Sequence, residues 1–255
     1  MKSDAEILYE DKTHRCYRFQ VGEELEADRH LPSSQYLIVH NDEAVLLEPG
    51  GQSIAPGVMD RVMERTSLEK IGHIFYSHQD PDVLSSILDW TTLTPAVIHL
   101  SALWERFVSH LGVLDSQKLR PIPDHGGKLD LGTGDALYFI PAHFLHSPGN
   151  FSLYDSRSKI LFSGDIGASI FPLGKGYDRV ERFEQHLPFC EGFHRRYMAG
   201  NAACRAWVER VRRFNVEMIV PHHGAYYPKE AVEPFLDWLE NLECGIDRIP
   251  AIYGE

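Results

Sequence analysis

One imidazole and two carboxylates lie within five residues, between His78 and Asp82. Carboxylates that close together repel each other unless a cation neutralises them, and a metal ion is the simplest such cation. The apolar run 73–77 reads as a buried strand that ends at this point, and we expect a helix from about residue 82. A carboxylate at a helix start also favours the helix dipole, but that explains Asp82 alone. The stretch therefore predicts a metal-binding loop between a strand and a helix.

The same pattern recurs further along the chain, because a metal-capable side chain follows four other apolar strands within a few residues. These side chains are Glu48, His146, Asp165 and His223. Residues delivered from several strand ends suit a site at one rim of a layered fold, where loops carry the functional groups. Two choices stay open at this level, since His143 competes with His146 and His222 competes with His223.

The elements that must position these residues alternate along the whole chain. Strands are expected at 16–21, 36–40, 44–47, 73–77, 96–100, 128–131, 136–140, 151–154, 160–163 and 217–220. Helices are expected at 56–67, 83–91, 101–111, 204–214 and 230–244, with helical sequence from about residue 190. Apolar strands of this kind need cover on both faces. We therefore predict one domain, residues 1–255, of the α+β or α/β class, in which two sheets pack face to face with helices outside each.

Composition excludes several classes of function. The formal net charge is −12, which argues against nucleic acid or an anionic membrane as the main partner. No apolar run reaches the roughly 20 residues of a membrane-spanning helix, and the N-terminus has no apolar core of a secretory signal. The four cysteines are scattered without a CxxC pair, which is typical of reduced thiols. These features together predict a cytoplasmic protein.

The order of these motifs resembles that of the metallo-β-lactamase fold, an αββα sandwich with a dinuclear metal site at its edge. Its signature loop, HxHxDH, is followed by a downstream His, a bridging Asp and a final His; this chain reads HQDPDV from His78. Asp80 replaces the second His of the zinc hydrolases, and carboxylate-rich sites favour harder ions than all-imidazole sites do. Val83 replaces the last His and cannot coordinate, so the second metal has an open position or its site is empty.

Two segments around other candidate ligands resemble one branch of this fold more specifically. LHSPGNF and LFSGDIG, around His146 and Asp165, are similar to flavodiiron segments. HQDPD in a chain without a flavodoxin domain resembles the oxygen-binding di-iron proteins that are related to the flavodiiron core. The resemblance implies two iron ions, with zinc as the alternative, and no flavin in this chain.

Carried over position by position, the resemblance implies six ligands and no further catalytic residue. The first iron takes His78, Asp80 and His146; the second takes Asp82 and His223; Asp165 bridges the two. Four other residues are candidates for contacts around the ligands: Glu48, His222, His194 and Tyr197. We expect Glu48 to orient the metal loop from a turn. The stretch 193–201 either lines the pocket from a helix or forms an exposed helix start.

The function implied is binding, and slow reduction, of O₂ as an oxygen sensor or carrier that reports to a signalling or electron-transfer protein. Whether the chain is an enzyme stays open. One alternative is a metal-dependent hydrolase of the same superfamily, which the loss of a ligand at Val83 disfavours. The other is a flavodiiron-like reductase of O₂ or NO that needs an external electron donor. The sequence does not define the oligomeric state.

Overall fold

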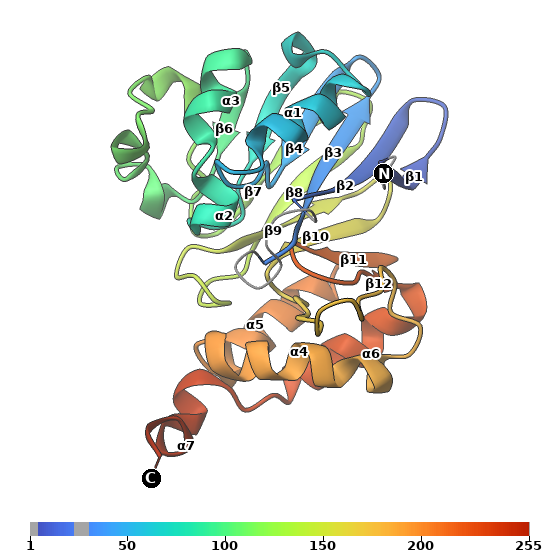
Figure 1. Cartoon of the computed structure of the whole chain (residues 1–255), viewed down its shortest axis with the longest axis vertical. Coiled ribbons are helices and arrows are strands. Elements are labelled where there is room, and N and C mark those ends of the chain that lie inside the picture. Colours follow the sequence, from blue (N-terminus) through green and yellow to red (C-terminus); the bar gives the residue numbers. More distant parts are fainter. Residues whose placement is uncertain (1–4, 23–30, 255) are drawn as a thin grey trace. The chain divides into compact units, whose positions relative to one another are not determined.

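The structure is a computed structural model that describes residues 5–22 and 31–254. The chain divides into two compact units, Met1–Ala136 and Leu137–Glu255 (Figure 1). The single domain expected for residues 1–255 stays a prediction. Residues 1–4, part of the N-terminus that was expected to carry no secretory signal, lie outside the described residues. No helix within the described ranges is long and apolar enough to cross a membrane.

The first unit is built on a mixed sheet. Its strands are β1 (Glu6–Glu10), β2 (His14–Val21), β3 (Ser33–His40), β4 (Glu43–Leu47), β5 (Ile71–Phe75) and β6 (Val97–His99), and β7 (Gly127–Asp130) follows them in the chain. β1 to β4 pair antiparallel in sequence order, and β5 and β6 then add parallel to β4. Asn41 has a positive φ of 54° in the β3–β4 turn, where asparagine is one of the residues that tolerate it.

Short helices accompany this sheet. They are α1 (Ala55–Met63), η1 (Leu68–Lys70), α2 (Pro81–Leu84), α3 (Ile87–Leu93), η2 (Ala102–Trp104), η3 (Val108–Leu111) and η4 (Ser116–Lys118). The single helix expected at 83–91 is two helices, because the chain breaks at Ser85 and Ser86, where the Ser86 hydroxyl donates to the Gly50 carbonyl. The helix expected at 101–111 was wrong. Of the residues in η2 and η3 only Val108 is buried, so packing supports only 3₁₀ turns there.

Apolar side chains of the sheet, α1, α2 and α3 form the core of the first unit. Val83 belongs to this core together with Ile87 and Trp90, and all three are fully buried. The residue that the sequence singled out as unable to coordinate therefore has a packing role of its own. The open coordination position expected beside it stays a prediction.

The second unit contains β8 (Ala136–Pro141), β9 (Phe151–Asp155), β10 (Ile160–Gly164), β11 (Met218–Pro221) and β12 (Tyr227–Pro228). Their order is β12-β11-β10-β9-β8, with β10 and β11 parallel and the other pairs antiparallel. Its helices are α4 (Phe183–Tyr197), α5 (Asn201–Val211), α6 (Lys229–Glu240), η5 (Gly245–Arg248) and α7 (Ile249–Tyr253). Residues of α4, α5 and α6 share one apolar core with the strands.

The last long helix ends earlier than the expected residue 244, at Glu240. The Asn201 side-chain amide donates to the carbonyls of Glu240 and Leu242, at 2.8 and 2.9 Å. These carbonyls thus find a partner outside the helix, which lets the chain leave the helical path. A side chain 39 residues away along the sequence therefore helps to decide where α6 ends.

Candidate metal centre

His78 lies three residues after the end of β5 and is buried. Its Nδ1 lies 2.8 Å from the Ser77 hydroxyl oxygen, and its Nε2 lies 3.8 Å from Oδ2 of Asp80. The hydrogen bond at Nδ1 fixes the ring so that Nε2 faces the carboxylate. Such an outer hydrogen bond at one ring nitrogen is the usual way in which a metal-binding imidazole is oriented.

The two carboxylates of the loop occupy defined positions at a helix start. Asp80 is the N-cap residue of α2, with extended backbone, and Pro81 and Asp82 form its first turn. Proline at this position favours the helix because its missing N–H has no partner there in any case. Gln79 donates its side-chain amide to Oδ1 of Asp80 at 3.0 Å. The loop thus places the Asp80 carboxylate next to His78 and Asp82 in the first turn of the helix that follows.

Glu48 holds the same loop from the end of β4. Glu48 is 2% exposed and has a positive φ of 51°, an uncommon conformation for a residue other than glycine. Its Oε1 accepts a hydrogen bond from the Ser77 backbone N–H at 2.9 Å. A hydrogen bond to a buried carboxylate is stronger than one between neutral groups. Glu48 therefore fixes the backbone immediately before His78.

In the second unit, Asp165 faces two histidines at once. Its Oδ2 lies 3.0 Å from Nε2 of His146, and its Oδ1 lies 3.7 Å from Nε2 of His223. Side-chain exposure is 11% for His146, 7% for Asp165 and 3% for His223. Each oxygen of one carboxylate thus points to a different imidazole, an arrangement that suits a carboxylate that bridges two metals.

The paired histidines that competed in the sequence have different neighbours, and the choice between them stays a prediction. His146 contacts Asp165, whereas the ring of His143 packs edge-on against Phe151 with centroids 5.1 Å apart. His223 contacts Asp165, whereas the His222 ring packs against that of His223 at 4.5 Å. The backbone N–H of His222 also donates to the Gly164 carbonyl at 2.7 Å, which ties this loop to the end of β10.

His194 and Tyr227 hold the turn that follows Asp165. The Gly167 N–H donates to Nε2 of His194, and the Tyr227 hydroxyl donates to the Gly167 carbonyl, both at 2.8 Å. Nδ1 of His194 lies 2.7 Å from the Cys190 carbonyl, so it carries the proton and Nε2 accepts. Burial lowers the pKa of His194 to about 4, which keeps this ring neutral. The sequence named His194 without assigning it this contact.

An aromatic pair on α4 packs beside His146. The rings of Phe193 and Tyr197 stack at 4.7 Å, and each meets the His146 ring edge-on, at 5.9 and 5.8 Å. Tyr197 is 56% exposed, so it forms the outer part of this wall. Sequence reasoning missed the contact of Phe193; the signal available was its spacing of four residues from Tyr197, which puts both on one helix face.

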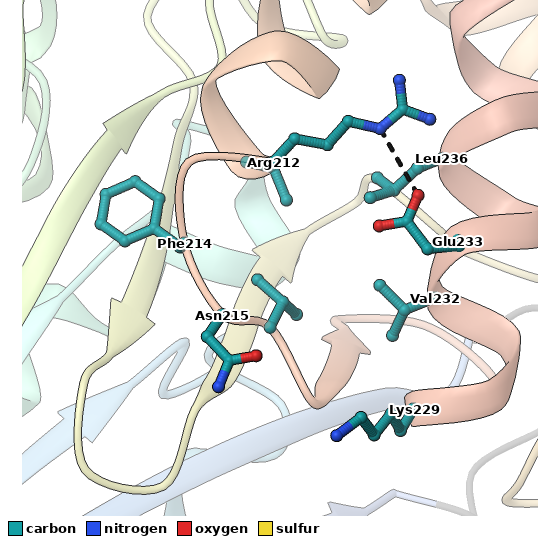
Figure 2. A pocket seen from close by; sticks show the side chains of 9 residues that line it. Arg212, Phe214, Asn215, Lys229, Val232, Glu233 and Leu236 are labelled. Carbon is teal, nitrogen blue, oxygen red and sulfur yellow. Dashed lines mark ion pairs between the residues drawn. The ribbon is translucent and has the colours of Figure 1, made fainter.

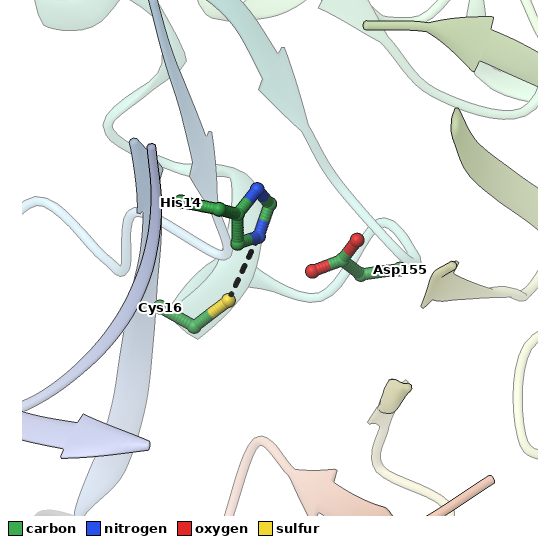
Figure 3. A group of neighbouring side chains, drawn as sticks. All are labelled: His14, Cys16 and Asp155. Carbon is green, nitrogen blue, oxygen red and sulfur yellow. Dashed lines mark hydrogen bonds between the residues drawn. The ribbon is translucent and has the colours of Figure 1, made fainter. Parts of the chain in front are cut away.

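Two other features involve none of these ligand candidates. A pocket of about 230 Å³ in the second unit is bordered by Arg212, Lys229 and Glu233 and has an apolar floor (Figure 2). Arg212 is paired there with Glu233 at 3.4 Å and also with two further carboxylates of α6. In the first unit, Sγ of Cys16 lies 3.4 Å from Nε2 of His14 on β2 (Figure 3). Neither feature contains a residue predicted for the site.

Two solved structures match nearly the whole chain. One is titled a peroxy diiron species of chemotaxis sensor ODP, with 46% identity, 98% of this chain and 100% of that chain covered, and a TM-score of 0.86. The other is the apo state of chemotaxis sensor ODP from T. denticola, with 47% identity, 98% of each chain covered and a TM-score of 0.87. A mutant flavo di-iron protein from Thermotoga maritima, at 19% identity and a TM-score of 0.76, shares the fold; the match covers 92% of this chain and 60% of that one.

The curated relatives are longer proteins. An anaerobic nitric oxide reductase flavorubredoxin of Aliivibrio salmonicida (strain LFI1238) is 25% identical over 247 residues, which cover 91% of this chain and 47% of the relative. The chain thus spans about half the length of the curated relatives it matches. The family described as ODP family beta lactamase matches residues 31–224. The two mixed sheets with their helices confirm the predicted metallo-β-lactamase-like fold class, and the chain belongs to the ODP family of beta-lactamase-like proteins.

Proposed function

We propose that this chain is a di-iron protein that binds O₂ and acts as an oxygen sensor. The observation that carries the proposal is the Asp165 carboxylate, whose two oxygens face His146 and His223 separately. The single domain of residues 1–255 is part of this proposal.

The chemistry of the donor groups fits iron. His78, Asp80 and His146 would hold the first iron, Asp82 and His223 the second, and Asp165 would bridge. Imidazole and carboxylate without thiolate suit iron and similar ions rather than the soft metals. Two ferrous ions carry four positive charges against the three carboxylates, so the set is nearly neutral. Near-neutrality suits a buried site, because net charge is costly to remove from water.

When bound, such a metal pair supplies the electrons that O₂ accepts. The surrounding residues have other tasks. Ser77 and Glu48 orient the His78 loop, and His194, held neutral, fixes the turn after Asp165. Phe193 packs edge-on against the His146 ring.

A sensing role is supported by the relatives. Two structures at 46 and 47% identity carry the name chemotaxis sensor ODP, and their matches cover 98% of this chain. We extend that role to this chain, with O₂ as the ligand and a signalling protein as the partner. A reducing, cytoplasmic location suits the four cysteines, which are thiols rather than disulfides in this structure.

The test combines metal analysis with paired histidine variants. The protein is loaded with ferrous iron without oxygen, its iron is counted, and O₂ is then titrated while the visible spectrum is recorded. We expect two irons per chain and a visible band that saturates with O₂. H146A and H223A should lose iron and the band, whereas H143A, whose ring packs against Phe151, should keep two irons. A featureless spectrum with two irons bound would refute O₂ binding.

A second candidate is reduction of O₂ or NO with electrons from a separate protein. The similarity to a nitric oxide reductase flavorubredoxin over 91% of this chain favours it. Sustained consumption of O₂ or NO with a rubredoxin-type donor would support the reductase. Uptake that stops after one equivalent per site would support the sensor. Zinc in the isolated protein together with turnover of an ester panel would instead indicate the hydrolase.

A further inference from the structure

Two cysteines meet in the second unit, in a part of the structure that the proposed function does not use. Cys204 lies in the first turns of α5, and Cys244 directly precedes η5, 40 residues further along the chain. Their sulfurs are 3.7 Å apart, and both residues are fully buried. Sulfurs in contact need only a small side-chain adjustment to reach the bond length of a disulfide.

The backbone around both cysteines is already connected. Oδ2 of Asp247 accepts from the N–H of Asn201 at 2.6 Å and from the N–H of Cys244 at 3.3 Å. The Ile246 N–H donates to the Ala199 carbonyl at 2.9 Å, so the chain after Cys244 is anchored just before α5. The start of α5 and the segment of Cys244 thus form one frame. Covalent pairing of the sulfurs does not require either segment to move away from this position.

Gly245 makes the close approach of these segments possible. It has a positive φ of 49°, and a side chain there would overlap the backbone carbonyls of Met198 and Ala199. The glycine lets Cys244 reach Cys204 at the point where the chain returns to α5.

The two thiols also differ in acidity. The hydrogen bond between the sulfurs is the main influence on each; it lowers the pKa of Cys244 and raises that of Cys204. Cys244 is therefore the better nucleophile, because the thiolate is the form that reacts. Burial raises the pKa of a third thiol, Cys190, to about 12, so that thiol is the poorer nucleophile.

We propose that Cys204 and Cys244 are a redox modification site that hydrogen peroxide converts reversibly into a disulfide. The Cys244 sulfur attacks one peroxide oxygen, the O–O bond breaks, and water leaves with the thiol proton. The Cys204 sulfur then displaces the hydroxyl from the resulting sulfenic acid, and its proton leaves with a second water. Two thiols and one peroxide thus give one disulfide and two waters. Local opening of the terminal segment admits the small oxidant.

The test uses the full-length, metal-free protein with a chelator, so it does not depend on iron binding. Reduced protein is treated with hydrogen peroxide, denatured, alkylated and analysed by peptide mass spectrometry. We expect two of the four thiols to disappear, a Cys204–Cys244 linked peptide to form, and dithiothreitol to restore both thiols. Cys16 and Cys190 serve as internal controls and should remain alkylatable.

Variants test which cysteine attacks the peroxide and which one then forms the disulfide. In C204S, dimedone should trap a sulfenic acid on Cys244 and no disulfide should form. In C190S the linked peptide should form in the same yield as in the parent protein. Loss of all four thiols at one rate would overturn the proposal, and so would oxidation of Cys244 to sulfinic acid in the parent protein while Cys204 stays reduced.

Discussion

Replacing Gly224 with alanine tests how closely the segment His223–Ala225 packs against Ser169. Gly224 has a positive φ of 81°, and an added Cβ would lie 2.5 Å from the Ser169 carbonyl oxygen. Ser169 is joined to this segment by two hydrogen bonds, from its own N–H to the His223 carbonyl at 3.2 Å and from the Ala225 N–H to its hydroxyl at 3.1 Å. A methyl group at Gly224 therefore forces the two segments apart.

The expected loss of stability has two parts. Left-handed backbone costs a residue with a side chain about 1 kcal/mol or somewhat more. Separation of Ser169 from the segment His223–Ala225 weakens two hydrogen bonds that are worth about 1 kcal/mol each. We expect G224A to lower the free energy of unfolding by about 3 kcal/mol. G174A is the matched control, because Gly174 has a φ of 72° but open space where its Cβ would be, so only the backbone cost of about 1 kcal/mol applies.

Urea unfolding of the metal-free proteins measures both values under the same conditions. With a slope of about 3 kcal/mol per molar, the midpoint of G224A should fall by about 1 M and that of G174A by about a third as much. G224A should also bind less iron, because the contact with Ser169 positions His223. G174A should keep two irons per chain. Equal midpoints for the two variants would refute the steric argument. Equal iron content in both variants would show that the contact with Ser169 does not position His223.

Three further changes probe other parts of the structure. Burial, and next the neighbouring His73, lower the pKa of His99 to about 3, so its contribution to stability is present above pH 6.5 and is lost as the pH falls toward 3. Between pH 6 and 4 this one group makes the free energy of unfolding change by about 1.4 kcal/mol per pH unit. H99N should remove that part of the slope in urea titrations over this pH range. H194A should cost about 3 kcal/mol by the same assay and reduce the iron content, whereas Y197A, at an exposed position, should change stability by less than about 1 kcal/mol. V83H should destabilise the metal-free protein by about 3 kcal/mol, because it buries an imidazole in the apolar core; unchanged stability would show that this core tolerates the ring.

Local order along the sequence, together with the family resemblance, was sufficient to predict the fold class and to propose the residues that could bind metal. The β3–β4 hairpin, the strand before His78 and the helix start at Asp82 all depend on neighbours in the chain. Their signals are alternation, chain-breaking residues and capping, which act over a few positions and are legible without a structure. The candidate ligands follow from the same signals, since each one stands where an apolar strand ends.

The tertiary structure decided what depends on distant residues. Only the fold brings Asp165 between two histidines, places the His194 ring on the Gly167 N–H, and sets Cys204 against Cys244. The helix expected at 101–111 was wrong for the same reason, since a short helix is stable only when packing covers one face. Sequence spacing predicts which groups are available at each strand end. Their orientation, burial and acidity arise from contacts between segments that are far apart in the chain.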